Sequence, residues 1–362
     1  MRFYKKMWLL PAGIWILFQL SAPGEPAGRQ LHAAGPKMER IDAHAHVFNS
    51  APEFVRMLER LNIRALSICV VDKYERGYEQ VAPQHETAPR LYRESRGRIA
   101  WCSTFDPEGW ETPGYAAKVI PQLEETFKNG ALAVKIYKSI GMNLKSRSGA
   151  YLMPDNPVFD TIFQLVAKRN KTLYAHIAEP MGAWRPLDPS DPDYGYYKNA
   201  PAWHMYGRPG VPTKEEILAA RDRMIARNPG LRVIGCHLGS MEENVDEIAK
   251  RFDRYPNFAV DTAARVLHLM LQPRDKVRAF MIKYQDRILY ATDLVFMGWE
   301  GRASTIKKWE AEYGRDYRYF ATDGEVKAEG RKFRGLALPE QVLRKLYYEN
   351  AVRWVPGIVP TK

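Results

Sequence analysis

The sequence predicts an α/β protein folded as a parallel (β/α)8 barrel, and three observations support this. Past residue 39, short apolar runs alternate with amphipathic helical stretches, and eight such units can be counted. Eight is the number of units that closes a barrel of parallel strands. Polar residues also gather at the carboxyl ends of the runs, where such barrels carry their active sites. A doubly wound open sheet is the second choice, because no Gly-rich phosphate loop accompanies the strands.

The expected strands are short runs rich in apolar and β-branched residues. They cover residues 40–48, 64–72, 99–107, 131–139, 172–180, 231–239, 257–265 and 287–295. Between these runs, apolar residues recur with the period of an α-helix. This pattern predicts helices at 52–62, 156–170, 213–229 and 243–255, and a final helix within 338–355. The excursion over 296–338 is expected to cover the side of the substrate pocket opposite the loop over 179–213, or to form a subunit contact in a homo-oligomer.

The N-terminus is expected to be a secretory signal peptide, residues 1–27. It has a basic start, an apolar run from Met7 to Leu20 and small residues after that run. The run is short for a membrane span, so we expect an exported protein, periplasmic or secreted, without a transmembrane span. An uncleaved leader would instead anchor the protein to the membrane. Residues 39–358 are expected to form one catalytic domain.

The formal net charge of +12 is partly an effect of the leader. Five basic residues and one acidic residue fall within residues 1–38, which leaves +8 for the remainder. This balance suits an anionic substrate, but the basic residues are scattered, so nucleic-acid binding is not indicated. The three cysteines, Cys69, Cys102 and Cys236, lack C-x-x-C spacing and are expected to be buried small hydrophobes.

The first expected strand, RIDAHAHVF, carries Asp42, His44 and His46 on every second position. Alternate residues of a strand share a face, so these three side chains are expected to point the same way. Each would cost about 1–3 kcal/mol if it were left unpaired in a core. A bound metal ion would remove that cost, because neutral imidazoles are good ligands for zinc and similar ions. Asp42 is expected to brace the strand or a neighbouring histidine.

Polar residues end the later strands at the same rim. They are Lys135, Tyr137, His176, His237, Asp261, Arg265 and Asp293. His176 and Asp293 would complete three imidazoles and one carboxylate with room for water, as an open catalytic site needs. A divalent ion lowers the pKa of water bound to it from 15.7 to about 7. Asp293 would then move a proton of that water, and His237 would orient the water or polarise a substrate carbonyl.

These residues resemble motifs of the amidohydrolase superfamily. The resemblance rests on the H-x-H of the first strand, the later histidines, the ATD at 291–293 and the closing YYENAVRWV. The closing helix is similar to that of the amidohydrolase-related (amidohydrolase 2) branch, which includes aminocarboxymuconate semialdehyde decarboxylase. The resemblance spans residues 40–355 and implies a distorted TIM barrel with one divalent metal ion. That ion is usually zinc, with manganese or iron as alternatives.

The same resemblance implies roles for individual residues. The metal ligands would be His44, His46, His176 and Asp293, and His237 would be the catalytic histidine beside them. Strand alternation also points Lys135 into the barrel, where a buried amine must be paired, neutral or modified. Three roles stay open for Lys135: a carboxylated lysine that bridges two metal ions, a group that binds a substrate carboxylate, or a structural ion pair. A second metal ion is expected only in the first case.

The loop over residues 179–213 begins beside a proposed ligand and is rich in aromatic residues. Long structured loops are often functional, so we expect this one to wall the pocket of a small-molecule substrate. Packing of its aromatic side chains onto the barrel is an equal alternative. The substrate-binding candidates are Tyr137, Trp184, Arg185, Trp203, His204 and Arg265. His32, His85 and His268 are interpreted as incidental, with His85 in a loop and His268 on a helix.

The leading functional hypothesis is a hydrolase that uses metal-activated water on an amide, lactone or ester. Its substrate would be small and anionic or aromatic. A metal-dependent decarboxylase is the alternative, disfavoured mainly by the predicted export. A TatD-type nuclease is set aside, because Lys135 stands where a glutamate would be needed and no phosphate-binding basic patch is evident. A non-catalytic metal-binding barrel is the alternative from another class.

Overall fold

The structure is a computed structural model that describes residues 38–74, 80–298 and 301–360. The predicted signal peptide and His32 lie outside these residues. Export, and the bounds of the predicted domain, stay predictions.

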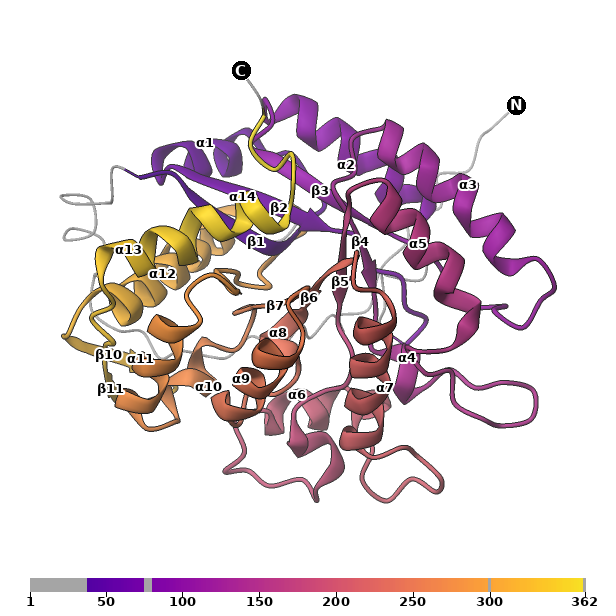
Figure 1. Cartoon of the computed structure of the whole chain (residues 1–362). Coiled ribbons are helices and arrows are strands. Elements are labelled where there is room, and N and C mark those ends of the chain that lie inside the picture. Colours follow the sequence, from indigo (N-terminus) through magenta and orange to yellow (C-terminus); the bar gives the residue numbers. More distant parts are fainter. Residues whose placement is uncertain (1–37, 75–79, 299–300, 361–362) are drawn as a thin grey trace, which may run out of the picture.

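Nine parallel strands follow one another around a curled sheet (Figure 1). The strands are β1 (Arg40–Val47), β2 (Ile63–Ile68), β3 (Ile99–Thr104), β4 (Ala133–Ile136), β5 (Thr172–Ala175), β6 (Arg232–Gly235), β7 (Phe258–Asp261), β8 (Ile288–Leu289) and β9 (Val295–Phe296). They pair in the order β8-β7-β6-β5-β4-β3-β2-β1-β9. The predicted α/β barrel with a single domain is confirmed. The strands are shorter than predicted, because their last residues turn away into the rim.

The eighth predicted strand is split into β8 and β9, which together close the barrel. β8 pairs with β7, and β9 pairs with β1. Between them, the Asp293 N–H donates to the His44 carbonyl at 2.8 Å. Asp293 has a φ of 64°, in the left-handed region that a regular strand does not use. The prediction of one continuous strand is therefore wrong at Asp293.

Helices surround the sheet on its outer side (Figure 1). The longer ones are α1 (Pro52–Arg60), α2 (Ala82–Glu94), α3 (Tyr115–Lys128), α5 (Asp160–Lys168), α7 (Lys214–Arg227), α9 (Val245–Arg254) and α11 (Arg274–Lys283). The chain ends in α13 (Glu340–Arg344), η5 (Lys345–Glu349) and α14 (Asn350–Trp354). The predicted helices are all present. Among the described helices, none is both long and apolar enough to cross a membrane.

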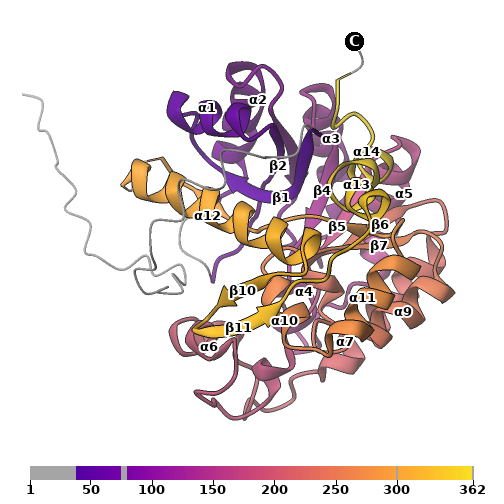
Figure 2. The same cartoon turned by 90° about the vertical axis from the view of Figure 1, so that its left-hand side faces the viewer.

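The excursion after β9 supplies the helix of the eighth unit. It consists of α12 (Arg302–Ala321) and a hairpin of β10 (Glu325–Ala328) and β11 (Arg331–Arg334). Figure 2 shows α12 lying along the side of the barrel between α1 and the hairpin. The indole of Trp309 on α12 packs edge-on against Phe54 of α1, with ring centroids 4.8 Å apart. The segment therefore covers the outer side of the barrel, and the two roles predicted for it, at the substrate pocket or in a subunit contact, stay predictions.

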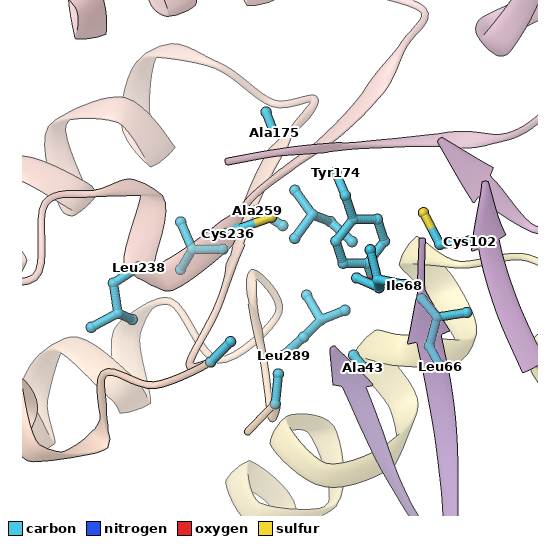
Figure 3. Packing of buried hydrophobic residues seen from close by; sticks show 14 of the residues in the cluster. Ala43, Leu66, Ile68, Cys102, Tyr174, Ala175, Cys236, Leu238, Ala259 and Leu289 are labelled. Carbon is cyan, nitrogen blue, oxygen red and sulfur yellow. The ribbon is translucent and has the colours of Figure 1, made fainter. Parts of the chain in front are cut away.

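The barrel interior is filled by apolar side chains from successive strands. Figure 3 shows Leu66, Ile68, Tyr174 and Leu289 converging there, and all four are buried. Strands buried on both faces read as continuous apolar runs, which is why the sequence pattern located them. The three cysteines are buried and free, as predicted. Burial raises the pKa of the Cys69 thiol to about 12.

Strand β1 contains a bulge that separates Asp42 from the two histidines. Its register against β2 shifts between Asp42 and Ala45. An extra residue in a strand turns the following side chains to the other face. Asp42 accepts a hydrogen bond from the hydroxyl of Tyr313 on α12 at 3.0 Å, whereas His44 points toward Lys135 on β4. The prediction that all three polar side chains share one face is therefore wrong for Asp42.

His85 lies on α2 and not in a loop, which corrects the sequence interpretation. Its Nε2 lies 3.1 Å from the Ser103 hydroxyl, and its ring lies beside Trp101 with centroids 5.9 Å apart. Burial lowers the pKa of His85 from 6.5 to about 4.

The lowered pKa of His85 predicts a loss of stability as the pH falls from 6.5 to 4. The unfolded chain takes up a proton on His85 near pH 6.5, whereas the folded protein does so only near pH 4, so acid favours unfolding. Urea unfolding at several pH values should show a steeper decline for the wild type than for His85→Gln. Parallel curves for the two proteins over this range would contradict the assignment.

Candidate metal centre

Two histidines of β1 and one aspartate of the β8–β9 bend meet at the mouth of the barrel. The Oδ1 atom of Asp293 lies 3.3 Å from Nε2 of His44 and 3.2 Å from Nε2 of His46. One donor atom from each of these residues lies within 4.8 Å of the other two. Both imidazoles are buried, while the Asp293 side chain is 29% exposed. The group is therefore compact and still reachable from solvent.

The other ring nitrogens fix the tautomers of the two histidines. Nδ1 of His44 donates to Oδ2 of Asp261 at 2.8 Å, and Nδ1 of His46 donates to the Ile68 carbonyl at 2.8 Å. In a neutral imidazole with a protonated Nδ1, Nε2 carries a lone pair. Two lone pairs thus face the Asp293 carboxylate. The Lys135 ammonium, 3.1 Å from Nε2 of His44, offsets part of the repulsion between these groups, and a bound metal ion would offset the rest.

Electrostatics favour the states of His44 and Asp293 that a metal requires. Burial lowers the pKa of His44, and the nearby Lys135 lowers it further, against the opposing effect of Asp261. Burial works to raise the pKa of Asp293, but His237, His46 and His44 outweigh it and hold that pKa well below its usual value. Neutral imidazoles and an ionised carboxylate are the forms that bind divalent metals.

His176 follows β5 and lies beside His237, outside the three-residue group of His44, His46 and Asp293. Its ring centroid lies 4.2 Å from that of His237, which in turn lies 5.1 Å from that of His44. Its buried Nε2 has no hydrogen-bond partner among the described residues, although it lies 3.4 Å from Oε1 of Glu179. Burial, with Lys138 next in effect, lowers the pKa of His176 well below its usual value. An unsatisfied, neutral ring nitrogen is a ready metal ligand.

His237 lies on α8 (Cys236–Gly239), directly after β6. Its backbone N–H donates to Oδ1 of Asp261 at 2.7 Å, and its ring Nδ1 donates to the Ala263 carbonyl at 2.9 Å. His237, Leu238 and Ser240 all have φ between 56° and 58°, a conformation that non-glycine residues rarely adopt. Burial, then the neighbouring His176, lowers the pKa of His237 well below its usual value. The strained turn presents a neutral imidazole to the site.

Lys135 points inward, as predicted, and is 1% exposed. Its Nζ lies 3.1 Å from Nε2 of His44. Its neighbour is thus an imidazole, and no carboxylate of the described residues forms an ion pair with it. Three roles are open for Lys135 from the sequence. Of these, the structural ion pair has no support among the described residues.

Asp42 braces the bend that carries Asp293. Its Oδ2 accepts from the Thr292 hydroxyl at 2.6 Å, and its Oδ1 accepts from the Thr292 N–H at 3.1 Å. It also accepts the N–H of His44 at 3.2 Å. Burial raises the pKa of Asp42 to about 7, against these hydrogen bonds. The bracing role predicted for Asp42 is confirmed, although it acts from the outer face of the barrel.

The predicted substrate-binding residues divide into two groups. Tyr137 stands edge-on to His176, with ring centroids 5.1 Å apart, and Trp203 packs against Tyr137 at 5.7 Å. These two lie beside the metal centre. Trp184 donates to the Pro212 carbonyl, and His204 donates to the carbonyl of Arg185, whose side chain is exposed. This second group holds the loop together.

Arg265 is buried beside the site, but acidic residues already surround it. Its Nε lies 3.5 Å from Oε2 of Glu242, which also pairs with Lys214. His268 lies on α10 (Val266–Met270), as predicted, and its Nε2 lies 3.0 Å from Asp193. The sequence reading attached no role to Glu179 or Glu242. Glu179, three residues after His176, could have been found from that spacing.

The chain matches the family model described as amidohydrolase over residues 41–357. It belongs to the amidohydrolase family. The match covers the strands and bends that carry the donors above, and it confirms the resemblance seen in the sequence. None of the curated proteins compared with the chain matches it.

Solved structures with the same fold are only distantly related in sequence. The 2,6-dihydroxybenzoate decarboxylase from Rhizobium is 13% identical with a TM-score of 0.51, covering 88% of this chain and 98% of that one. A dihydroxybenzoic acid decarboxylase from Polaromonas with bound manganese is 14% identical with a TM-score of 0.49, covering 88% and 97%. A probable 2-pyrone-4,6-dicarboxylic acid hydrolase from Acinetobacter baumannii is 9% identical with a TM-score of 0.47, covering 88% and 99%. At these identities the likeness concerns the fold alone.

Asp261→Asn should lower metal affinity about 10–100-fold, because Asp261 orients both His44 and His237. Competition with a chromogenic chelator measures the zinc dissociation constant. Asp253→Asn is the matched control, since Asp253 accepts its hydrogen bond from Tyr284 at an exposed position on α9. Equal affinity for Asp261→Asn and the wild type would show that this carboxylate does not support the site.

Proposed function

We propose that the chain is a metal-dependent hydrolase that cleaves an amide, lactone or ester bond of a small anionic or aromatic molecule. The observation that carries the proposal is the ionised, partly exposed Asp293 carboxylate facing the lone pairs of two imidazoles. A carboxylate held in this way is suited both to a cation and to a water molecule. Metal-assisted hydrolysis uses both.

Donor atoms of His44, His46 and Asp293 lie close enough together to share one divalent cation, and His176 is proposed to complete its coordination. Nε2 of His44, His46 and His176 and Oδ1 of Asp293 would hold it, with zinc expected and manganese or iron as alternatives. When bound, such an ion polarises a carbonyl and lowers the pKa of a water molecule. A second ion would require a carboxylated Lys135. The described residues also group His44 with Cys236 and Asp261, but burial raises the pKa of Cys236 and so disfavours the thiolate.

Asp293 is the proposed proton carrier of the reaction. Its low pKa keeps it ionised, so it accepts the proton that the attacking water gives up. It then donates that proton to the leaving nitrogen or oxygen, which restores the carboxylate. The exposure of its side chain, 29%, lets both water and substrate reach it.

His237 is proposed to orient the attacking water. Because its Nδ1 donates to the Ala263 carbonyl, the neutral ring offers Nε2 as an acceptor. A neutral Nε2 accepts a hydrogen bond from water but does not donate one to a substrate carbonyl. Of the two roles open from the sequence, the structure therefore favours orientation of water.

Substrate recognition is proposed to use Tyr137, backed by the buried Trp203, as an apolar wall and the buried cations as the anion site. Lys135 is the nearer cation, 3.1 Å from a proposed ligand. Arg265 is partly neutralised by Glu242, so it would bind a carboxylate less strongly than a free guanidinium. These features favour a compact substrate with at least one acidic group.

The second candidate is a metal-dependent decarboxylase acting on an aromatic acid. It is favoured by Lys135 and Arg265, which would bind the carboxylate of the substrate beside the metal. Decarboxylases with this fold, such as the Rhizobium enzyme, are known among solved structures. A panel of lactones, amides, esters and carboxybenzoates, assayed with release of carbon dioxide monitored, separates the two reactions. Ring opening or ester cleavage without gas supports hydrolysis, and carbon dioxide release overturns it.

His176→Ala should lose metal and activity together, whereas His237→Ala should keep stoichiometric metal and lose turnover. The reason is that His176 has a free Nε2, whereas His237 is proposed to act on water. Elemental analysis and steady-state rates on the same preparations give both readouts. A fully active His237→Ala protein would refute its role. A wild-type protein that holds no zinc, manganese or iron would favour the non-catalytic barrel.

A further inference from the structure

A buried ion pair lies between the end of β4 and the residue that opens the loop after β5. Nζ of Lys138 lies 2.5 Å from Oε1 of Glu179, and the two side chains are 3% and 2% exposed. Two charges at this depth are stable only when they are paired and further hydrogen-bonded. We propose that the Lys138–Glu179 pair fastens the cover segment, residues 179–213, to the barrel and positions His176 for the cation. The proposal rests on the metal site proposed above.

The first part of the argument is that aromatic side chains of the cover segment converge on this pair. The ammonium of Lys138 lies 4.3 Å from the ring centroid of Trp203 and 4.8 Å from that of Tyr196. It also donates to the Tyr196 hydroxyl. Tyr197 donates to Oε2 of Glu179 at 3.2 Å. Tyr196 lies on α6 (Tyr194–Asn199) and Trp203 on η4 (Pro201–Trp203), so one pair holds two separate turns.

Cation–π contacts of this kind gain strength when the cation is desolvated. Lys138 is 2% exposed and Trp203 is fully buried, so water does not compete for the ammonium. The segment is long and has only short helical turns of its own, so contacts to the barrel must hold it in place. The Lys138–Glu179 pair is the charged centre of those contacts.

The second part of the argument is that the pair reaches the proposed metal ligand. Oε1 of Glu179, the atom that binds Lys138, also lies 3.4 Å from Nε2 of His176. Tyr137 stands between the two groups, with its ring 5.3 Å from the Lys138 ammonium and 5.1 Å from the His176 ring centroid. Movement of the pair would therefore move both neighbours of His176. Lys138 and Glu179 act through His176, as positioning residues.

The experiment uses the double variant Lys138→Met/Glu179→Gln beside each single variant. A single substitution removes one charge of the pair, whereas the double variant removes both and keeps the net charge of the protein unchanged. Glu39→Gln/Arg64→Met is the control, because this pair lies at the opposite end of the barrel with a separation of 3.1 Å. Two readouts are measured on full-length protein: the transfer of zinc to a chromogenic chelator, and tryptic cleavage within the cover segment after Lys198, the basic residue of this segment that proline does not follow.

The proposal predicts that the double variant transfers zinc about 10–100-fold faster than wild type and is cut faster within residues 179–213. The control should match the wild type in both readouts. Wild-type behaviour of the double variant in either readout would overturn the proposal. Faster zinc transfer in Glu179→Gln with none in Lys138→Met, and no change in cleavage, would also overturn it, because Glu179 would then be a direct ligand.

The trypsin measurement is repeated on metal-free protein to separate this proposal from the proposed function. A wild type that binds no zinc refutes the metal site and the positioning of His176. Cleavage of the metal-free double variant then still decides whether the pair fastens the segment. Faster cleavage supports the fastening, and unchanged cleavage refutes it.

Discussion

The site depends on the carboxylate of Asp261, which binds two strands that are far apart in the sequence. One oxygen accepts from Nδ1 of His44 on β1, and the other accepts from the backbone N–H of His237 after β6. Both hydrogen bonds are buried. In the protein interior, a charged group that lacks its hydrogen bond lowers the free energy of unfolding strongly. Because the first bond fixes the tautomer of His44, it also decides which nitrogen faces Asp293. The orientation of the proposed ligands follows from this one residue at the end of β7.

Backbone strain at the rim is the second feature that shapes the site. Asp293, His237, Leu238 and Ser240 adopt left-handed conformations although none of them is a glycine. Such residues cost about 1–3 kcal/mol each and persist only where the surroundings over-determine them. Here Asp42 holds the bend before Asp293, and Asp261 holds the turn at His237. The barrel core, which is filled by side chains of the strands, is the rigid frame that holds these residues in their strained conformations.

The sequence predicted the barrel and the residues at its rim, because both follow from local patterns. Apolar runs separated by helices indicate parallel strands, and polar residues at strand ends indicate a site. The role of Asp261 could not be predicted in this way, since its partners lie on β1 and after β6. The bulge in β1 likewise depends on pairing with β2, so the alternation of Asp42 with His44 was misleading. The break between β8 and β9 comes from the left-handed backbone conformation of Asp293, which the amino-acid composition does not indicate.

Anomalous diffraction at the zinc, manganese and iron absorption edges, from crystals of protein purified without added metal, would test the central claim most directly. The account predicts one peak at the barrel mouth, bonded to Nε2 of His44, His46 and His176 and to Oδ1 of Asp293. No peak there, or a peak bonded to a different set of side chains, would contradict it.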